Sequence, residues 1–139
     1  MQVIDVNLIG TEYVIQKGTF WNPVVFLLKG DYTEWTPHGQ IRDKAGGELY
    51  ASFQFESIVL VTKIIEEEEI TYSRIKPFLN TTQTQNIPVT IAVKPNKPLI
   101  AGKNRWEYDI LLSHPTDEEI ILPVVQGLIE VNDTVTVIG

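Results

Sequence analysis

The chain contains no cysteine, only two histidines, and no apolar run long enough to cross a membrane. Without thiols it can form no disulfide, offer no cysteine nucleophile and bind no zinc through sulfur. Two histidines are too few for a metal site built from several imidazoles. The longest apolar runs, Val24–Leu28 and Ile120–Val125, are far shorter than the roughly 20 residues that span a bilayer. We therefore expect a soluble protein with no metal, no cofactor and no membrane partner.

Positive charge is also scarce. Eleven lysines and arginines stand against 18 aspartates and glutamates, which gives a formal net charge of −7. A surface with this balance repels the phosphate backbone of nucleic acids, so we expect no nucleic-acid partner. The N-terminal segment Met1–Asn7 lacks the basic start and the apolar run of a secretory signal.

What the chain does contain is typical of one globular domain. Its 139 residues can bury a core without covalent staples. Hydrophobic residues make up 43% and charged residues 21%, close to the average for folded proteins. We predict a single domain that spans residues 1–139.

The dominant hydrophobic period is two residues, which indicates strands. Leu49–Phe55 alternates apolar and polar side chains, and Trp106–Leu112 repeats the pattern. The continuous apolar run Val24–Leu28 instead predicts a strand that is buried on both faces. Further strands are expected at Ile58–Ile65 and Val124–Val131 and, with less regular patterns, at Val3–Ile9, Glu12–Gln16 and Ile70–Ile75.

Turn signals separate these segments at regular intervals, which predicts an all-β fold with an antiparallel sandwich. They lie at Lys44–Gly47, Lys94–Pro98 and His114–Asp117. One helical turn is expected at Asn80–Asn86, where Asn80 would cap its start. The segment Pro88–Gly102 contains three prolines and reads as an extended loop or protruding hairpin.

Three local details are expected within the strands. Gly46 and Gly47 permit a tight turn between a strand around Ile41 and the strand that follows. Arg42, beside Asp43, would tie this hairpin to a carboxylate at its edge. Gly127 marks a bulge or a close backbone approach in the last strand.

The residues that could bind a metal or act in catalysis all have a structural explanation. The run Glu66–Glu69 offers oxygen ligands for a cation, but successive strand residues point to opposite faces, so a solvated turn or edge fits better. Asp109, Ser113 and His114 are the residue types of a hydrolytic triad. On one strand, however, Asp109 and Ser113 would lie roughly 13 Å apart, too far for triad contacts. We therefore predict no catalytic, cofactor-binding or metal-binding residues, and no enzyme activity.

The three tryptophans leave one alternative open. Trp21, Trp35 and Trp106 could form an aromatic platform for a sugar. Trp106 belongs to an apolar face, which favours packing in the core. Trp21 and Trp35 lie near turns, and a glycan-binding site would need at least one of them exposed beside polar groups.

Short motifs of strand and turn residues follow one another along nearly the whole chain. They are Gln16–Trp21, Leu28–Trp35, Gln40–Phe53, Ile75–Leu79 with Thr84 and Ile87–Pro88, Trp106–Ile110, and Gly127–Thr136. Their order and spacing resemble those of small bacteriophage and prophage tail proteins. They also resemble the immunoglobulin-like N-terminal domain of baseplate upper proteins. Pro88–Gly102 and Glu66–Glu69 depart from that pattern, the former as an insertion.

This resemblance implies an immunoglobulin-like β-sandwich and a non-enzymatic structural subunit of a virion. Such a subunit would act as an adaptor or connector in the tail or baseplate, after assembly in the host cytoplasm. Its partners would be other virion structural proteins and further copies of itself in a symmetric homo-oligomer. The alternative function is a glycan-binding β-sandwich module that recognises a cell-surface carbohydrate. A third class, a small hydrolase with an acidic site, fits the residues least well.

Overall fold

The computed structural model describes residues 2–4 and 8–134, and these residues are mostly β, with 51% strand and 4% helix. Residues 5–7 of the predicted strand Val3–Ile9 lie outside this description, as do residues 135–136 of the motif Gly127–Thr136. The elements are β1 (Gln2–Ile4), β2 (Leu8–Gln16), β3 (Phe26–Lys29), β4 (Thr36–Arg42), β5 (Leu49–Ser52), β6 (Gln54–Phe55), β7 (Val59–Ile65), β8 (Glu68–Ile75), β9 (Pro77–Phe78), α1 (Thr81–Gln85), β10 (Trp106–Ser113) and β11 (Ile121–Asn132).

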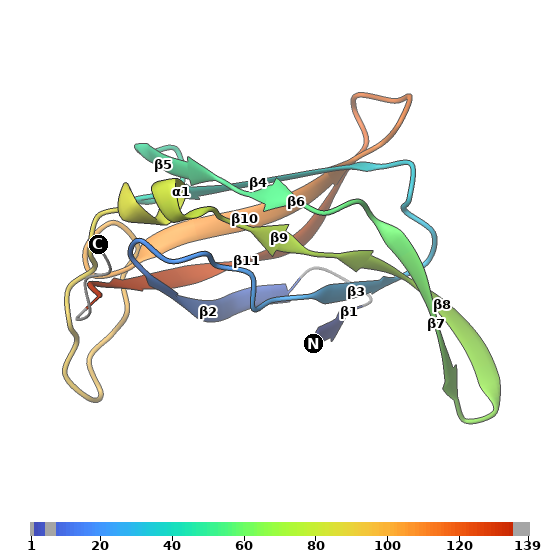
Figure 1. Cartoon of the computed structure of the whole chain (residues 1–139), viewed down its shortest axis with the longest axis horizontal. Coiled ribbons are helices and arrows are strands. Elements are labelled where there is room, and N and C mark those ends of the chain that lie inside the picture. Colours follow the sequence, from blue (N-terminus) through green and yellow to red (C-terminus); the bar gives the residue numbers. More distant parts are fainter. Residues whose placement is uncertain (1, 5–7, 135–139) are drawn as a thin grey trace.

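Two sheets share one hydrophobic core (Figure 1). The four-stranded sheet has the order β1-β3-β8-β7, and the five-stranded sheet has the order β2-β11-β10-β4-β5. A short pair, β6-β9, lies beside them. The arrangement agrees with the predicted all-β class.

The prediction of purely antiparallel sheets is wrong for the two N-terminal strands. β1 pairs with β3 in parallel, and β2 pairs with β11 in parallel. The remaining pairs among the described strands are antiparallel. A hydrophobic period of two reports which face of a strand is buried, but it says nothing of the direction of the neighbouring strand.

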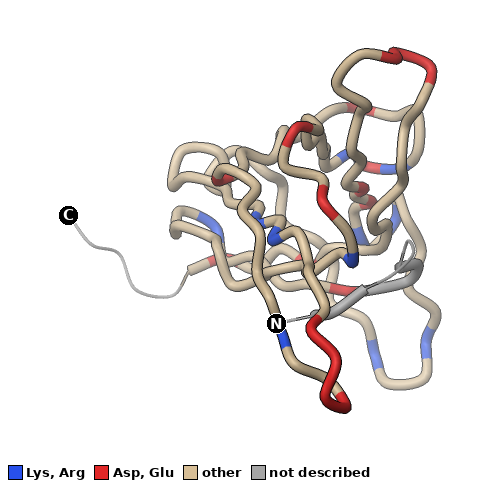
Figure 2. The backbone as a smooth tube through the Cα atoms, turned by 90° about the vertical axis from the view of Figure 1, so that its right-hand side faces the viewer, with Lys and Arg blue, Asp and Glu red and all other residues tan. Residues whose placement is uncertain are grey.

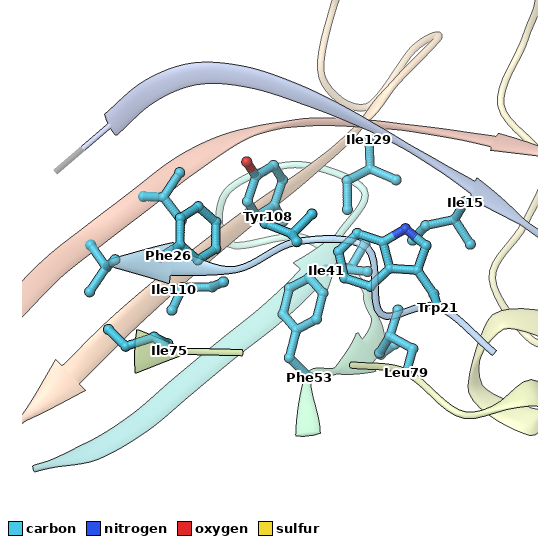
Figure 3. Close-up of a cluster of buried hydrophobic side chains, with 14 of the residues drawn as sticks. Ile15, Trp21, Phe26, Ile41, Phe53, Ile75, Leu79, Tyr108, Ile110 and Ile129 are labelled. Atoms are coloured by element: carbon cyan, nitrogen blue, oxygen red, sulfur yellow. The ribbon is translucent and has the colours of Figure 1, made fainter. Parts of the chain in front are cut away.

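The core consists of side chains that the two sheets direct toward each other (Figure 3). Phe26 and Ile75 come from the four-stranded sheet, while Tyr108, Ile110 and Ile129 come from the five-stranded sheet. Each of these side chains is at most 2% exposed. Burial raises the pKa of Tyr108 well above its usual value, with the nearby Tyr13 as a further cause.

The prediction that Val24–Leu28 forms a strand buried on both faces is confirmed for its last three residues. Phe26, Leu27 and Leu28 are successive residues of β3 and are all buried. Since successive side chains point to opposite faces of a strand, both faces of β3 are covered.

The predicted strand Leu49–Phe55 is divided into β5 and β6, and a bulge within β5 changes which of its side chains are exposed. Pairing with β4 skips Tyr50, so the register shifts by one residue at this point. A bulge changes the face to which the next side chain points. Leu49 is therefore exposed, whereas Ala51 and Phe53 keep the expected burial.

The helical turn predicted at Asn80–Asn86 is confirmed as α1. The Asn80 side chain accepts a hydrogen bond from the Gln83 backbone N–H, and the Gln83 side chain accepts one from the Asn80 backbone N–H. This reciprocal capping box satisfies two donors that the first turn of a helix leaves open. No helix in residues 2–4 and 8–134 is long and apolar enough to cross a membrane.

The predicted glycine turn is confirmed, whereas the bulge predicted at Gly127 lies in the neighbouring strand. Gly46 and Gly47 lie in the turn between β4 and β5, and Gly46 has a φ of 74°. The register between β11 and β2 shifts between Gln126 and Gly127, but the extra residue is Gly10 of β2, so the bulge lies in the strand beside Gly127. Arg42 differs from its prediction, because its guanidinium donates to the Gly47 carbonyl and to the Gln40 side chain rather than to Asp43. The carboxylate of Asp43 accepts instead from the backbone N–H of Lys44.

Candidate functional site

The outer face of the five-stranded sheet carries the polar side chains of β10 and β4. Ile110 and Leu112 point into the core, so Asp109 and Ser113 face away from it. Asp109 lies opposite Gln40 of β4 and Gln126 of β11. Asp109 and Ser113, two residues of the triad that the sequence analysis considered, therefore lie on this face.

The three residues of the considered triad are held by different partners. Nδ1 of His114 accepts hydrogen bonds from the backbone N–H groups of Thr116 at 3.2 Å and Asp117 at 3.1 Å. The Asp109 carboxylate accepts a backbone hydrogen bond from Gln40. Oγ of Ser113 lies 2.9 Å from Nε2 of His38, on the neighbouring strand. Each of the three side chains thus has a partner outside the triad.

The contact between His38 and Ser113 was not predicted. The two residues are 75 positions apart in sequence, and only the pairing of β4 with β10 brings them together. The Ser113 hydroxyl also lies 3.4 Å from the Thr36 carbonyl oxygen, to which it can donate. These contacts tie the start of β4 to the end of β10.

Two clefts adjoin Asp109 on this outer face. One, of about 180 Å³, is lined by residues that include Arg42, Glu107 and Gln126. The other, of about 380 Å³, lies over His38 and Leu111. Burial raises the pKa of Asp109, while the Gln40 hydrogen bond and the charge of Arg42 act in the opposite direction.

Gly39 allows the strands below these clefts to approach closely. A Cβ at this position would lie 2.8 Å from the Asp109 carbonyl oxygen and 2.8 Å from Cδ2 of Phe53. Any side chain here would force β4 away from β10. This glycine thus has a packing role that the sequence did not indicate.

The burial of the three tryptophans differs from the prediction. Trp21, and not Trp106, is the tryptophan in the core, with 5% of its surface exposed. Trp106 is half-buried at the edge of the core, where its ring meets Tyr50 and its Nε1 donates to the Pro88 carbonyl at 2.7 Å. The prediction for Trp106 is therefore only partly right, because its ring packs against the core without being fully buried.

A sugar platform that uses Trp21 conflicts with this burial. Trp35 is half-buried, with Tyr32 and His114 packed edge-on against its ring at 5.1 Å and 5.0 Å between centroids. The glycan alternative needed at least one of Trp21 and Trp35 exposed, and Trp35 is the one that is only partly buried.

The run Glu66–Glu69 forms the turn and the first strand residues of a hairpin made by β7 and β8. Glu66 and Glu67 have φ values of 52° and 68°, the left-handed conformations found in two-residue hairpin turns. All four side chains are exposed. The described residues contain no group of three or more histidines, cysteines and carboxylates that could hold a metal ion. The predicted solvated turn is confirmed.

The β7–β8 hairpin projects beyond the rest of the molecule (Figure 1). In the described sheet, β7 is an edge strand that pairs only with β8. Its aliphatic side chains remain accessible: Val59, Leu60, Ile64 and Ile65 are 40%, 47%, 78% and 43% exposed. We call these four residues, together with Glu66–Glu69, the hairpin surface.

A second projecting segment comprises residues 91–104, which we call the lysine loop. Between Ile91 and Ile100 it forms no helix or strand, and it carries Lys94, Lys97 and Lys103 on its exterior. Arg105, which is 5% exposed, anchors its end through Glu12 at 2.9 Å and Glu130 at 3.1 Å.

Comparison with known proteins gives no further assignment. No protein-family model matches the chain, and no curated protein sequence matches it.

Proposed function

We propose that this chain is a non-enzymatic structural subunit of a bacteriophage virion, an adaptor or connector in the tail or baseplate. The observation that carries this proposal is the hairpin surface, where four aliphatic side chains of an edge strand stay exposed. Unpaired edges and exposed apolar patches are common where another protein chain binds. In a virion, other structural proteins or further copies of this chain would cover them.

The positions of the motifs that resemble tail proteins support the virion assignment. Gln40 and Ile41 of one motif pair with Asp109 and Tyr108 of another, and Tyr108 also pairs with Gly127 of the last motif. These motifs thus meet on β4, β10 and β11, at the centre of one sheet. Residues that build a shared scaffold would be placed in this way. We propose that the two sheets form an immunoglobulin-like sandwich with Pro88–Gly102 as its protruding proline-rich loop.

The contacts of the polar residues also support a structural role. His38 and Ser113 hold β4 against β10, and His114 orders the turn that follows β10. Arg42 closes the hairpin between β4 and β5 through the Gly47 carbonyl. These side chains thus maintain the geometry of strands and turns.

Quantitative mass spectrometry of purified particles tests this proposal. The chain should be present at a fixed ratio to a known tail protein, set by the rotational symmetry of the particle, since homomeric assemblies close through repeated identical interfaces. Particles that lack the protein, with all of it found in the host cytoplasm, would refute the structural assignment.

A further inference from the structure

Exposed charge is distributed unequally between the two ends of the long axis of the molecule. One end carries the acidic turn Glu66–Glu69 and the loop with Asp117, Glu118 and Glu119, all exposed. Figure 2 views this end, with one acidic segment at the top and the other at the bottom. In Figure 1 the lysine loop projects at the opposite end.

A further lysine adds to the positive end. A Cβ built on Gly102 would lie 3.2 Å from Cδ of Lys44, so the stem of this side chain runs along the base of the lysine loop. Lys44, Lys94, Lys97 and Lys103 are exposed. The ion pairs in residues 2–4 and 8–134 involve Arg74, Lys76 and Arg105, so neither these lysines nor Glu66–Glu69 form an ion pair with another described residue.

Both ends also expose aliphatic side chains beside their charges. On the hairpin surface, Ile64 lies opposite Glu69 and is 78% exposed. On the lysine loop, Ile91, Leu99 and Ile100 are 63%, 40% and 38% exposed. Each surface thus combines exposed aliphatic groups with charge, and the charges on the two surfaces have opposite signs. The two surfaces are therefore complementary.

Both surfaces have firm attachments to the fold. β8 continues from the hairpin into the four-stranded sheet, where Tyr72, Ser73 and Ile75 are buried. The lysine loop is held by Arg105, whose guanidinium also donates to the Ile91 carbonyl at 3.0 Å. A surface fixed in this way loses less conformational freedom when it binds a partner.

We propose that the partner of the hairpin surface is the lysine loop of a second copy of this chain. The carboxylates of Glu66–Glu69 contact Lys94, Lys97 and Lys103, and Ile64 packs against the aliphatic side chains of the loop. This interface deepens the proposed function, since it specifies how copies of the subunit join one another.

Such a contact joins opposite ends of identical molecules. When two copies lie antiparallel, the contact forms twice and closes a dimer. When they join end to end, each copy still offers its other end to the next, and the assembly becomes a ring or a filament according to the rotation between copies. Because the charges are exposed, association should weaken as salt is added.

Sedimentation velocity with the purified full chain tests the interface. One variant changes Glu66–Glu69 to lysine, a second changes Lys94, Lys97 and Lys103 to glutamate, and a third combines both sets. The combined variant nearly restores the natural net charge, because its four changes to lysine and three changes to glutamate almost cancel. Circular dichroism confirms that each variant is folded.

The natural chain should form dimers or larger species at low salt and lose them at high salt. Each single-surface variant should lose these species, and the combined variant should regain them. Ile64→Ser should weaken association without lowering the melting temperature, because this side chain makes little contact within the fold. A natural chain that stays monomeric at its highest soluble concentration would overturn the proposal, as would a folded combined variant that fails to associate.

This test is independent of the test of function. Purified protein reports on the interface alone, whereas the particle census reports on the virion role. Monomeric protein that is nevertheless present in particles at a fixed ratio would reject the interface and leave the proposed function standing.

Discussion

The part of the two sheets where they face each other and the projecting end of the β7–β8 hairpin are both rich in isoleucine, leucine and valine. They expose these side chains to very different extents. Ile110 of β10 is 1% exposed, whereas Ile64 of β7 is 78% exposed. Both lie on strands that pair antiparallel with a neighbour. The difference is that Ile110 has the opposite sheet above it, while the hairpin projects beyond the other elements (Figure 1). An apolar strand is thus part of a core only where a second layer covers it.

The largest effect should come from emptying the core at Ile110. Ile110→Ala should lower the free energy of unfolding by about 2 to 5 kcal/mol, the usual cost of removing a fully buried aliphatic side chain and leaving a cavity. Denaturant melts monitored by circular dichroism measure this change. A loss below about 1 kcal/mol would mean that the two sheets can close around the missing side chain.

An intermediate effect is expected at Arg105, which joins the lysine loop to the edge of the five-stranded sheet. Arg105→Ala leaves the carboxylates of Glu12 and Glu130 without their partner. Breaking a fully buried pair costs about 3 to 5 kcal/mol, but these carboxylates are partly exposed, so we expect about 1 to 3 kcal/mol. Urea melts give the stability, and limited proteolysis should show earlier cleavage in residues 91–104. Unchanged proteolysis would show that other contacts hold the loop.

A smaller effect is expected at Asp109, on the outer face of the same sheet. Burial raises the pKa of its carboxyl group, so the charged form is less favourable in the folded protein than in the unfolded chain. This cost is fully present above the folded-state pKa and disappears below the unfolded value of about 3.9. Asp109→Asn should therefore be more stable than the natural chain at pH 7, and this advantage should vanish near pH 3. Urea melts at both pH values decide the point, and an equal advantage at both would contradict this explanation.

The smallest effect should occur at Ile64, the counterpart of Ile110 on the hairpin. Ile64→Ala in dilute monomer should change the free energy of unfolding by less than about 0.5 kcal/mol, as is usual for exposed positions. The same pair of denaturant melts compares the two isoleucine variants directly. A loss similar to that of Ile110→Ala would show that the hairpin packs against the fold in solution.

Features that depend on neighbouring residues could be predicted from the sequence. The alternation in Trp106–Leu112 located β10, and the buried run at Phe26–Leu28 located β3. The side chain of Asn80 indicated the start of α1 because capping uses a residue only three positions away.

Features that depend on distant residues could not be predicted in this way. The parallel pairing of β2 with β11 joins the two ends of the chain. The contact of His38 with Ser113 requires β4 to lie beside β10 in one particular register. Similarly, the apolar pattern of β7 predicted a strand but not its exposure, since exposure depends on where the opposite sheet ends.

In the proposed assembly, the core stabilises the fold while the hairpin surface and the lysine loop contact other copies. Amide hydrogen exchange of the natural chain at low and high protein concentration tests this division of roles. We expect the amides of β7 and of residues 91–104 to gain protection together at high concentration, while the amides of β10 stay equally protected at both. Unchanged exchange in β7 and the lysine loop, at concentrations where larger species are present, would contradict the account.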